Sequence, residues 1–115
     1  MRLSFITQEE QIKLEQLFLS AVGEEYVMTG SKARDILLRS KLSPNYLSQI
    51  WSICDTGNLG KLHFPQFALA MYLCVQKIRG KEIPDQMPEG IMAEIRSMLQ
   101  MINPFVVDSQ YIPSW

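Results

Sequence analysis

The stretch from Asp55 to Gln66 has the spacing of a twelve-residue calcium loop, but it lacks most of the calcium ligands. Such a loop places oxygen donors at positions 1, 3, 5, 9 and 12 and a glycine at position 6. Asp55 and Gly60 occupy positions 1 and 6. Positions 3, 5 and 12 hold Gly57, Leu59 and Gln66, which are poor ligands for a hard cation. The pattern therefore predicts a helix–loop–helix frame that does not hold calcium.

Length, composition and charge indicate one ordinary globular domain. The chain has 115 residues, of which 47% are hydrophobic and 20% charged, and its net charge is −1. This length supports a single hydrophobic core and is too short for two. A net charge near zero, without a basic run, is not typical of nucleic-acid binding. We therefore expect one domain that does not bind nucleic acid.

Two cysteines and the start of the chain bear on its location. Cys54 and Cys74 each lie in an apolar run, which favours buried free thiols in a reducing compartment over a disulfide. No apolar segment of a secretory signal follows Met1 and Arg2. The longest apolar run, residues 67–75, is far too short to span a membrane. We therefore expect a cytoplasmic protein.

Apolar spacing and helix-capping residues predict a nearly all-α domain. Thr7 and Glu10 form a capping box at the start of a first helix, and Ser43 with Pro44 marks the start of another. The first predicted helix starts at Thr7, the second covers about residues 31–40, and the third starts at Ser43. The fourth runs from near Phe64 to about Ile78, and a fifth covers residues 91–102.

Two short segments are predicted to connect these helices in space. Residues 61–63 can pair with residues 27–29 as a two-stranded mini-sheet, which would join two helix–loop–helix units. The predicted fold class is all-α: a pair of EF-hand-like units with a short two-stranded mini-sheet, plus a C-terminal extension. We place the domain at residues 1–95 and the extension at residues 96–115.

Two longer segments carry a resemblance to a known family. They read Leu-Ser-Gln-Ile-Trp-Ser-Ile-Cys-Asp at residues 47–55 and Phe-Pro-Gln-Phe-Ala-Leu-Ala-Met at residues 64–71. Together with Thr29–Gly30, residues 37–42 and Ile83–Pro84, they make residues 5–95 resemble the EH (Eps15-homology) domain. Residues 3–5, 33–38 and 64–65 look most like the EH modules of a fungal endocytic scaffold, which couples coat adaptors to actin assembly at cortical patches.

The resemblance implies a non-enzymatic function, the recognition of Asn-Pro-Phe motifs in endocytic adaptor proteins. Carried over position by position, it places the groove at Ala33, Leu37, Leu47 and Trp51, with Arg34 and Ser48 at the rim. The spacing agrees, since Ala33 and Leu37, like Leu47 and Trp51, are i, i+4 pairs on adjacent predicted helices. It also implies a cytoplasmic location at endocytic actin patches, with endosomes as a second location, and only indirect membrane contact.

Each of these residues also has a simpler interpretation. A tryptophan at helical spacing, such as Trp51, is a typical core residue, and Arg34 can be a solvated helix residue. Leu37 and Leu47 can serve the core and the groove together. His63, the single histidine, has no Cys or His partner at metal spacing, so we expect a surface or turn position.

Other classes of function find less support in the sequence. No arrangement typical of catalysis is recognisable, so we expect no enzyme activity. We also expect no cofactor, calcium included, because the loop lacks ligands at Gly57, Leu59 and Gln66. The alternatives that stay open are a calcium-responsive EF-hand switch and a structural oligomerisation module.

The chain also contains the tripeptide that such a domain binds, as Asn103, Pro104 and Phe105. Coincidence, or packing of Phe105 onto the domain, is one interpretation. The other is self-association through this motif, either in cis as a competitor for the groove or in trans as a head-to-tail contact.

Overall fold

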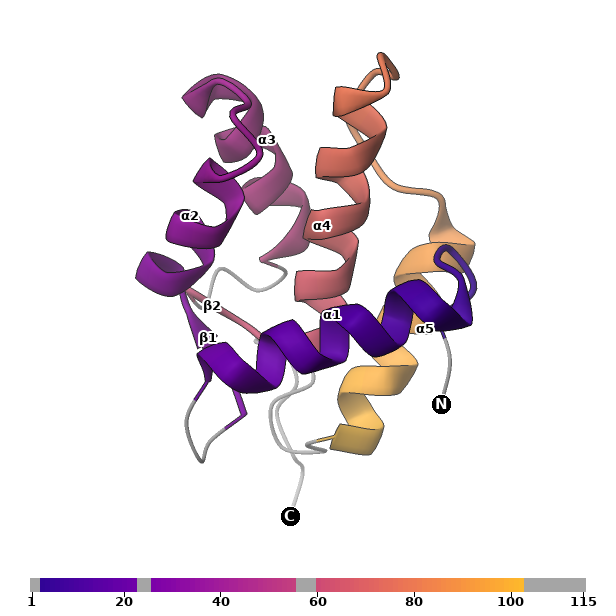
Figure 1. Cartoon of the computed structure of the whole chain (residues 1–115). Helices are drawn as coiled ribbons and strands as arrows, with labels where there is room; N and C mark the ends of the chain where they lie inside the picture. The colour runs from indigo at the N-terminus through magenta and orange to yellow at the C-terminus, as the bar shows by residue number, and fades with distance from the viewer. Residues whose placement is uncertain (1–2, 23–25, 56–59, 103–115) are drawn as a thin grey trace.

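The computed structural model describes residues 3–22, 26–55 and 60–102. Within these residues the chain forms five helices and two short strands (Figure 1). The elements are α1 (Gln8–Ala21), β1 (Met28–Thr29), α2 (Gly30–Leu38), α3 (Pro44–Cys54), β2 (Lys61–Leu62), α4 (Phe64–Ile78) and α5 (Glu89–Ile102). The predicted fold class is thus confirmed.

Local capping explains where the helices begin. At α1, the Glu10 backbone N–H donates to Thr7 Oγ1 (3.1 Å), and the Thr7 N–H donates to Glu10 Oε1 (2.8 Å). The hydrogen bond from the Thr7 backbone N–H, followed by the interaction of the Thr7 side chain with the Glu10 carboxylate, holds the pKa of Glu10 below its usual value. At α4, the His63 N–H donates to Gln66 Oε1 (2.9 Å), which closes the first turn in the same way. Pro44 occupies the first position of α3, as the sequence predicts.

The two helix–loop–helix units meet at a small antiparallel sheet. Met28 pairs with Leu62 and Thr29 with Lys61, which confirms the predicted pairing. Met28 and Leu62 are fully buried, so each strand contributes one side chain to the core. The pairing is extended by one hydrogen bond, in which the Gly30 N–H donates to the Gly60 carbonyl (3.0 Å).

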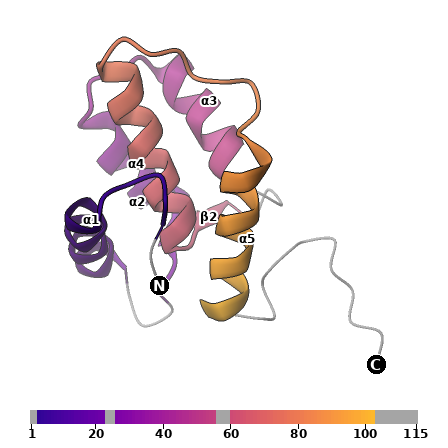
Figure 2. The same ribbon diagram turned by 90° about the vertical axis from the view of Figure 1, so that its right-hand side faces the viewer.

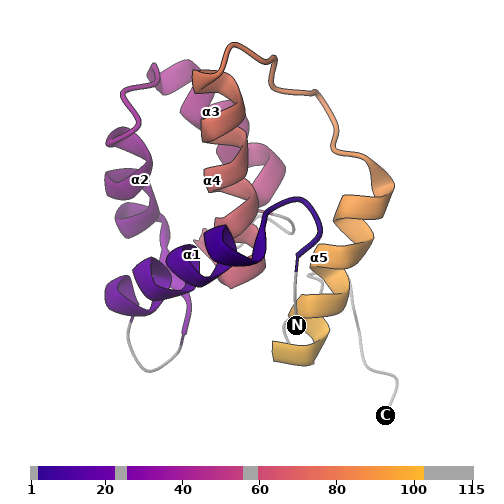
Figure 3. The same cartoon turned by 45° about the vertical axis from the view of Figure 1, so that its right-hand side comes forward.

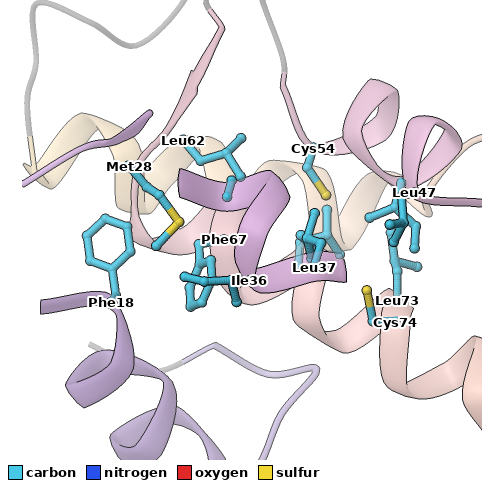
Figure 4. Close-up of a cluster of buried hydrophobic side chains, with 14 of the residues drawn as sticks. Phe18, Met28, Ile36, Leu37, Leu47, Cys54, Leu62, Phe67, Leu73 and Cys74 are labelled. Atoms are coloured by element: carbon cyan, nitrogen blue, oxygen red, sulfur yellow. The ribbon is translucent and has the colours of Figure 1, made fainter. Parts of the chain in front are cut away.

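Helix α4 runs through the centre of the domain, with α1 and α2 on one side and α5 on the other (Figures 1 and 2). Its side chains from Pro65 to Ala70 are all buried, as are Leu73 and Cys74. Figure 4 shows Phe67 of α4 among Phe18, Met28, Ile36 and Leu62. This cluster is the main hydrophobic core.

Helix α5 is held by apolar contacts and by the start of the chain. Ile95, Met98 and Leu99 are buried, and the hydroxyl of Ser4 donates to a carboxylate oxygen of Glu94 (2.6 Å). In Figure 3, α5 lies across α4 from α2. Helix α5 continues past residue 95, where we predict the boundary between the domain and the C-terminal extension.

Both cysteines are buried free thiols, as predicted. Burial raises the pKa of both, that of Cys74 to about 11. Among the described helices, none has both the length and the apolar character that a membrane crossing requires.

Candidate peptide-binding site

A cavity of about 500 Å³ opens between α2 and α3, and we call it the slot. The residues that line the slot are Gly30, Arg34, Leu37 and Leu38 from α2, and Pro44, Leu47, Ser48, Trp51 and Ser52 from α3. Each helix contributes a stripe of residues spaced by three or four positions, so both stripes face the same space. Most of these side chains are apolar, and the polar ones are Arg34, Ser48 and Ser52.

The floor of the slot is continuous with the hydrophobic core. Leu37 and Leu47 are only 3% and 8% exposed and belong to the core cluster, while the half-buried Trp51 packs against that cluster. A rigid floor of this kind is expected to keep the slot open in the free domain, because core side chains are closely packed. Leu37 and Leu47 therefore serve the core and the slot together.

Gly30 lies directly against the ring of Trp51. A Cβ atom at this position would sit 3.6 Å from the Cη2 atom of Trp51 and only 3.2 Å from the Gly60 carbonyl oxygen. The contact with the Gly60 carbonyl is tighter than a Cβ atom usually makes, which favours glycine here, whereas the distance to the ring is an ordinary van der Waals contact. Gly30 thus fixes one end of the slot and, through its hydrogen bond to Gly60, ties that end to the mini-sheet.

Five of the six residues predicted for the groove come together here: Arg34, Leu37, Leu47, Ser48 and Trp51. Ala33 does not line the slot. It is fully buried in the core beside Ile36, because the core side of α2 is formed by residues 33, 36 and 37. The slot side is formed instead by residues 30, 34, 37 and 38, and Leu37 lies where the two sides meet.

Four lining residues were missing from the sequence prediction: Gly30, Leu38, Pro44 and Ser52. Helical spacing carries a signal for each of them. Gly30 and Leu38 are four residues before and after Arg34, and Pro44 and Ser52 are four residues before and after Ser48. Extending the two rim positions by one helical turn in both directions would have found all four.

The chemistry of the slot suits a small apolar group with a polar edge. Arg34 provides the one formal charge among the residues that line it, and its guanidinium can donate to carbonyl or carboxylate oxygens. Arg34, Ser48 and Ser52 are exposed at the rim, whereas Leu37 and Leu47 are buried below them. An apolar side chain can thus enter while its backbone meets polar groups.

The described part of the calcium-like loop is engaged in backbone hydrogen bonds. The buried Asp55 accepts a hydrogen bond at Oδ2 from the Gly60 N–H (3.0 Å), and Gly60 has a φ of +74°. Gln66, at the last position of the loop, caps α4 as described above. In the described parts of the chain, no three His, Cys, Asp or Glu side chains gather as a metal site would require. Gly57 and Leu59 lie outside the described residues.

His63 is only 5% exposed, so the surface position that was one of its two expected positions is wrong. It stands between the buried residues Leu62 and Pro65, where β2 leads into α4. Burial, followed by the charge of Lys61, lowers the pKa of His63 below its ordinary value. The proposed self-ligand, Asn103, Pro104 and Phe105, lies outside the described residues.

Several known proteins are similar in sequence to this chain. A family model for the EH domain matches residues 6–104. The actin cytoskeleton-regulatory complex protein pan1 of Sclerotinia sclerotiorum is 56% identical over 102 residues, which are 89% of this chain and 7% of that protein. The protein of the same name from Aspergillus niger is 52% identical over 113 residues, 98% of this chain and 8% of that protein. The chain thus spans less than a tenth of the length of these relatives.

A solved structure shares the fold. The chain titled "Second EH domain of AtEH1/Pan1" superposes with a TM-score of 0.70 at 24% sequence identity. The superposition covers 76% of this chain and 85% of the other.

Proposed function

The chain belongs to the EH domain family, and on that premise we propose that its slot binds short peptides containing Asn-Pro-Phe, without catalysis. The observation that carries the proposal is the composition of the slot. It combines an apolar floor, a half-buried tryptophan and a polar rim in about 500 Å³. Concave apolar sites with a few polar groups are typical of small-ligand and peptide recognition.

The peptide would use each part of the slot. Its proline would pack on the ring of Trp51, and its phenylalanine would enter between Leu37 and Leu47. Its asparagine amide would meet the polar groups of Arg34 and Ser48 at the rim. Proline restricts the free peptide, so less conformational entropy is lost when the peptide docks.

A three-residue motif buries little surface, so we expect an affinity in the micromolar range or weaker. Several modules or several motifs would then be needed for stable attachment, because linking weak sites raises the effective concentration. We propose that the ligands are endocytic adaptor proteins. The protein that carries this module would be a scaffold that links coat assembly to actin, and the names of the relatives support its role in actin regulation. It would act in the cytoplasm at cortical patches, and it would contact the membrane only indirectly.

We further propose that the second helix–loop–helix unit works without calcium. The side-chain oxygens of Asp55 and Gln66 already accept backbone hydrogen bonds, and calcium takes six to eight oxygen ligands. Isothermal titration with calcium tests this proposal. Binding of one ion, or a change in peptide affinity when calcium is added, would favour a calcium-responsive switch instead.

The test of peptide binding is a titration of the ¹⁵N-labelled chain with an Asn-Pro-Phe peptide. An Asn-Pro-Ala peptide serves as the control. We expect shifts at Leu37, Leu47 and the Trp51 indole. No shifts are expected around the second cavity, which lies between α1 and α4 and is lined by Leu14 and Tyr72 among others. Equal responses to the two peptides, or a slot that does not respond, would refute the proposal.

Two matched aromatic variants sharpen the result. Trp51→Ala removes the aromatic wall of the slot, whereas Tyr72→Ala removes an aromatic side chain from the cavity between α1 and α4. The first should abolish measurable peptide binding and the second should leave it intact. If Trp51→Ala still binds its partners normally while it alters the assembly state of the protein, a structural oligomerisation module is the better explanation.

A further inference from the structure

We propose that Asn103, Pro104 and Phe105 of one copy of this chain dock into the slot of a second copy. This inference rests on the proposed function of the slot, and it commits to association in trans. The motif begins immediately after Ile102, the last residue of α5. Where α5 ends therefore decides which slot the motif can reach.

Helix α5 is anchored close to its end. Ile95, Met98 and Leu99 are 1%, 5% and 4% exposed, so the helix is held in place to within one turn of Ile102. It packs against α4, and in Figures 1 and 3 it lies on the opposite side of α4 from α2. The residues that line the slot all come from α2 and α3. Helix α5, which leads into the motif, thus lies across α4 from the α2 wall of the slot.

The covalent reach of the motif is short. Phe105 follows Ile102 by three residues, and a fully extended chain spans at most about 3.6 Å per residue, or roughly 11 Å here. A single α-helix with its side chains is already about 10–12 Å across. To reach the α2 wall of its own slot, the motif would have to pass α4 before Phe105 could turn inward, a path that takes up its whole reach. A second copy can approach the motif without this restriction.

Charge gives a second reason for choosing this occupant. Arg34 carries the one charge among the residues that line the slot. Asp108 is the one charged side chain between residues 103 and 115, and it follows Phe105 by three residues. A tail that enters the slot by Phe105 can therefore bring its single carboxylate to the rim where Arg34 stands.

The contact is head-to-tail, because a slot on one copy meets a tail on the next. Its slot and tail can therefore be disabled separately. Phe105→Ala keeps the slot and loses the motif. Trp51→Ala keeps the motif and loses the slot. Leu38→Lys is a second slot variant, which should fold readily because Leu38 is 43% exposed.

The experiment mixes these chains. The ¹⁵N-labelled Phe105→Ala chain is titrated with the unlabelled Trp51→Ala chain, and with Leu38→Lys if Trp51→Ala does not fold. We expect shifts at the Trp51 indole and at Leu47 of the labelled chain that grow with concentration. An unlabelled chain that also carries Phe105→Ala should bind at least about tenfold more weakly, since it lacks the buried aromatic group. Tyr111→Ala, which alters an aromatic residue of the tail outside the motif, should bind as before.

Asp108→Lys tests the charge pairing. An exposed ion pair is worth up to about fivefold in affinity, and the loss should shrink as salt is added. A loss that does not depend on salt would overturn the pairing with Arg34.

Two results would overturn docking in trans. If the slot signals of the wild-type and Phe105→Ala chains differ by the same amount at every concentration, the motif docks in cis. A synthetic Asn-Pro-Phe peptide that shifts the slot while the tail-bearing chain does not would remove the self-contact and leave the proposed function standing. If the peptide fails as well, the proposed function itself has failed.

Discussion

Two adjacent leucines of α2 should separate folding from binding. Leu37 is 3% exposed and belongs to the core, whereas Leu38 is 43% exposed and lines only the slot. Full burial of a leucine side chain is worth about 1.5–3 kcal/mol. A peptide that covers the exposed 43% of Leu38 would gain about 0.6–1.3 kcal/mol from it. We therefore expect Leu38→Ala to weaken peptide binding by about three- to ninefold.

Leu37→Ala should have a different effect. Leucine-to-alanine changes in a packed core cost about 2–5 kcal/mol, because the cavity is only partly filled by relaxation. This is a large part of the total stability of a small domain, which is about 5–15 kcal/mol. Leu38→Ala removes a side chain that already faces solvent, and alanine is the best helix former, so its cost to folding should stay below about 1 kcal/mol.

Both quantities can be measured in one background. The Phe105→Ala chain removes competition from the internal motif, urea unfolding gives the free energy of unfolding, and calorimetry gives the peptide affinity. We expect Leu37→Ala to lower both stability and affinity, because Leu37 belongs to the core and lines the slot, and Leu38→Ala to lower affinity with little loss of stability. This expectation would be refuted if Leu38→Ala bound the peptide as tightly as its parent, or if the two variants lost the same stability.

Three further outcomes follow from the structure. Gly30→Ala should weaken peptide binding and shift the Trp51 indole signal, because the new Cβ meets both the ring and Gly60; Gly90→Ala, where a Cβ meets nothing within 4 Å, is the control. The pKa of His63 is lowered by burial from an ordinary 6.5, so the unfolded chain binds the proton at higher pH than the folded chain does. The contribution of His63 to the free energy of unfolding should therefore be constant above a pH of about 6.5. It should fall as the pH drops below about 6.5, by at most about 1.4 kcal/mol per pH unit. Urea unfolding at several pH values should show this slope in the wild type and a flatter one in His63→Asn. Cys74, buried and with its pKa raised to about 11, should react with iodoacetamide at pH 8 only as fast as the domain opens, and mild urea should accelerate the reaction.

Features encoded by neighbouring residues were predictable from the sequence. The capping box of Thr7 and Glu10 and the proline at the start of α3 follow local rules, and they appear at the predicted positions. The mini-sheet was predictable because a calcium loop that lacks ligands still contains the segment around Lys61 and Leu62 that pairs with the first unit. Its register between Met28 and Leu62 buries both of these side chains.

Features that depend on how helices pack were harder to predict. Periodicity marks Ala33, Leu37 and Leu38 alike as apolar positions of one helix. Whether each faces the core or the slot depends on the rotation of α2 against α3 and α4, which the sequence of α2 does not contain. Periodicity alone therefore assigns Ala33 to the groove and does not identify Leu38 as a lining residue. His63 is a similar case, because the residue pattern around it does not show that it is buried.

The remnant of the calcium loop and the slot are joined by a short series of contacts. Asp55 accepts a hydrogen bond from the Gly60 N–H, and the Gly60 carbonyl accepts one from the Gly30 N–H. Gly30 in turn lies against the ring of Trp51. Each contact restrains the next, so the position of the tryptophan depends on a carboxylate that in a calcium loop would bind the ion. Asp55 at the first position of the loop thus has a structural role of its own, because its hydrogen bond to Gly60 stabilises the backbone behind the slot.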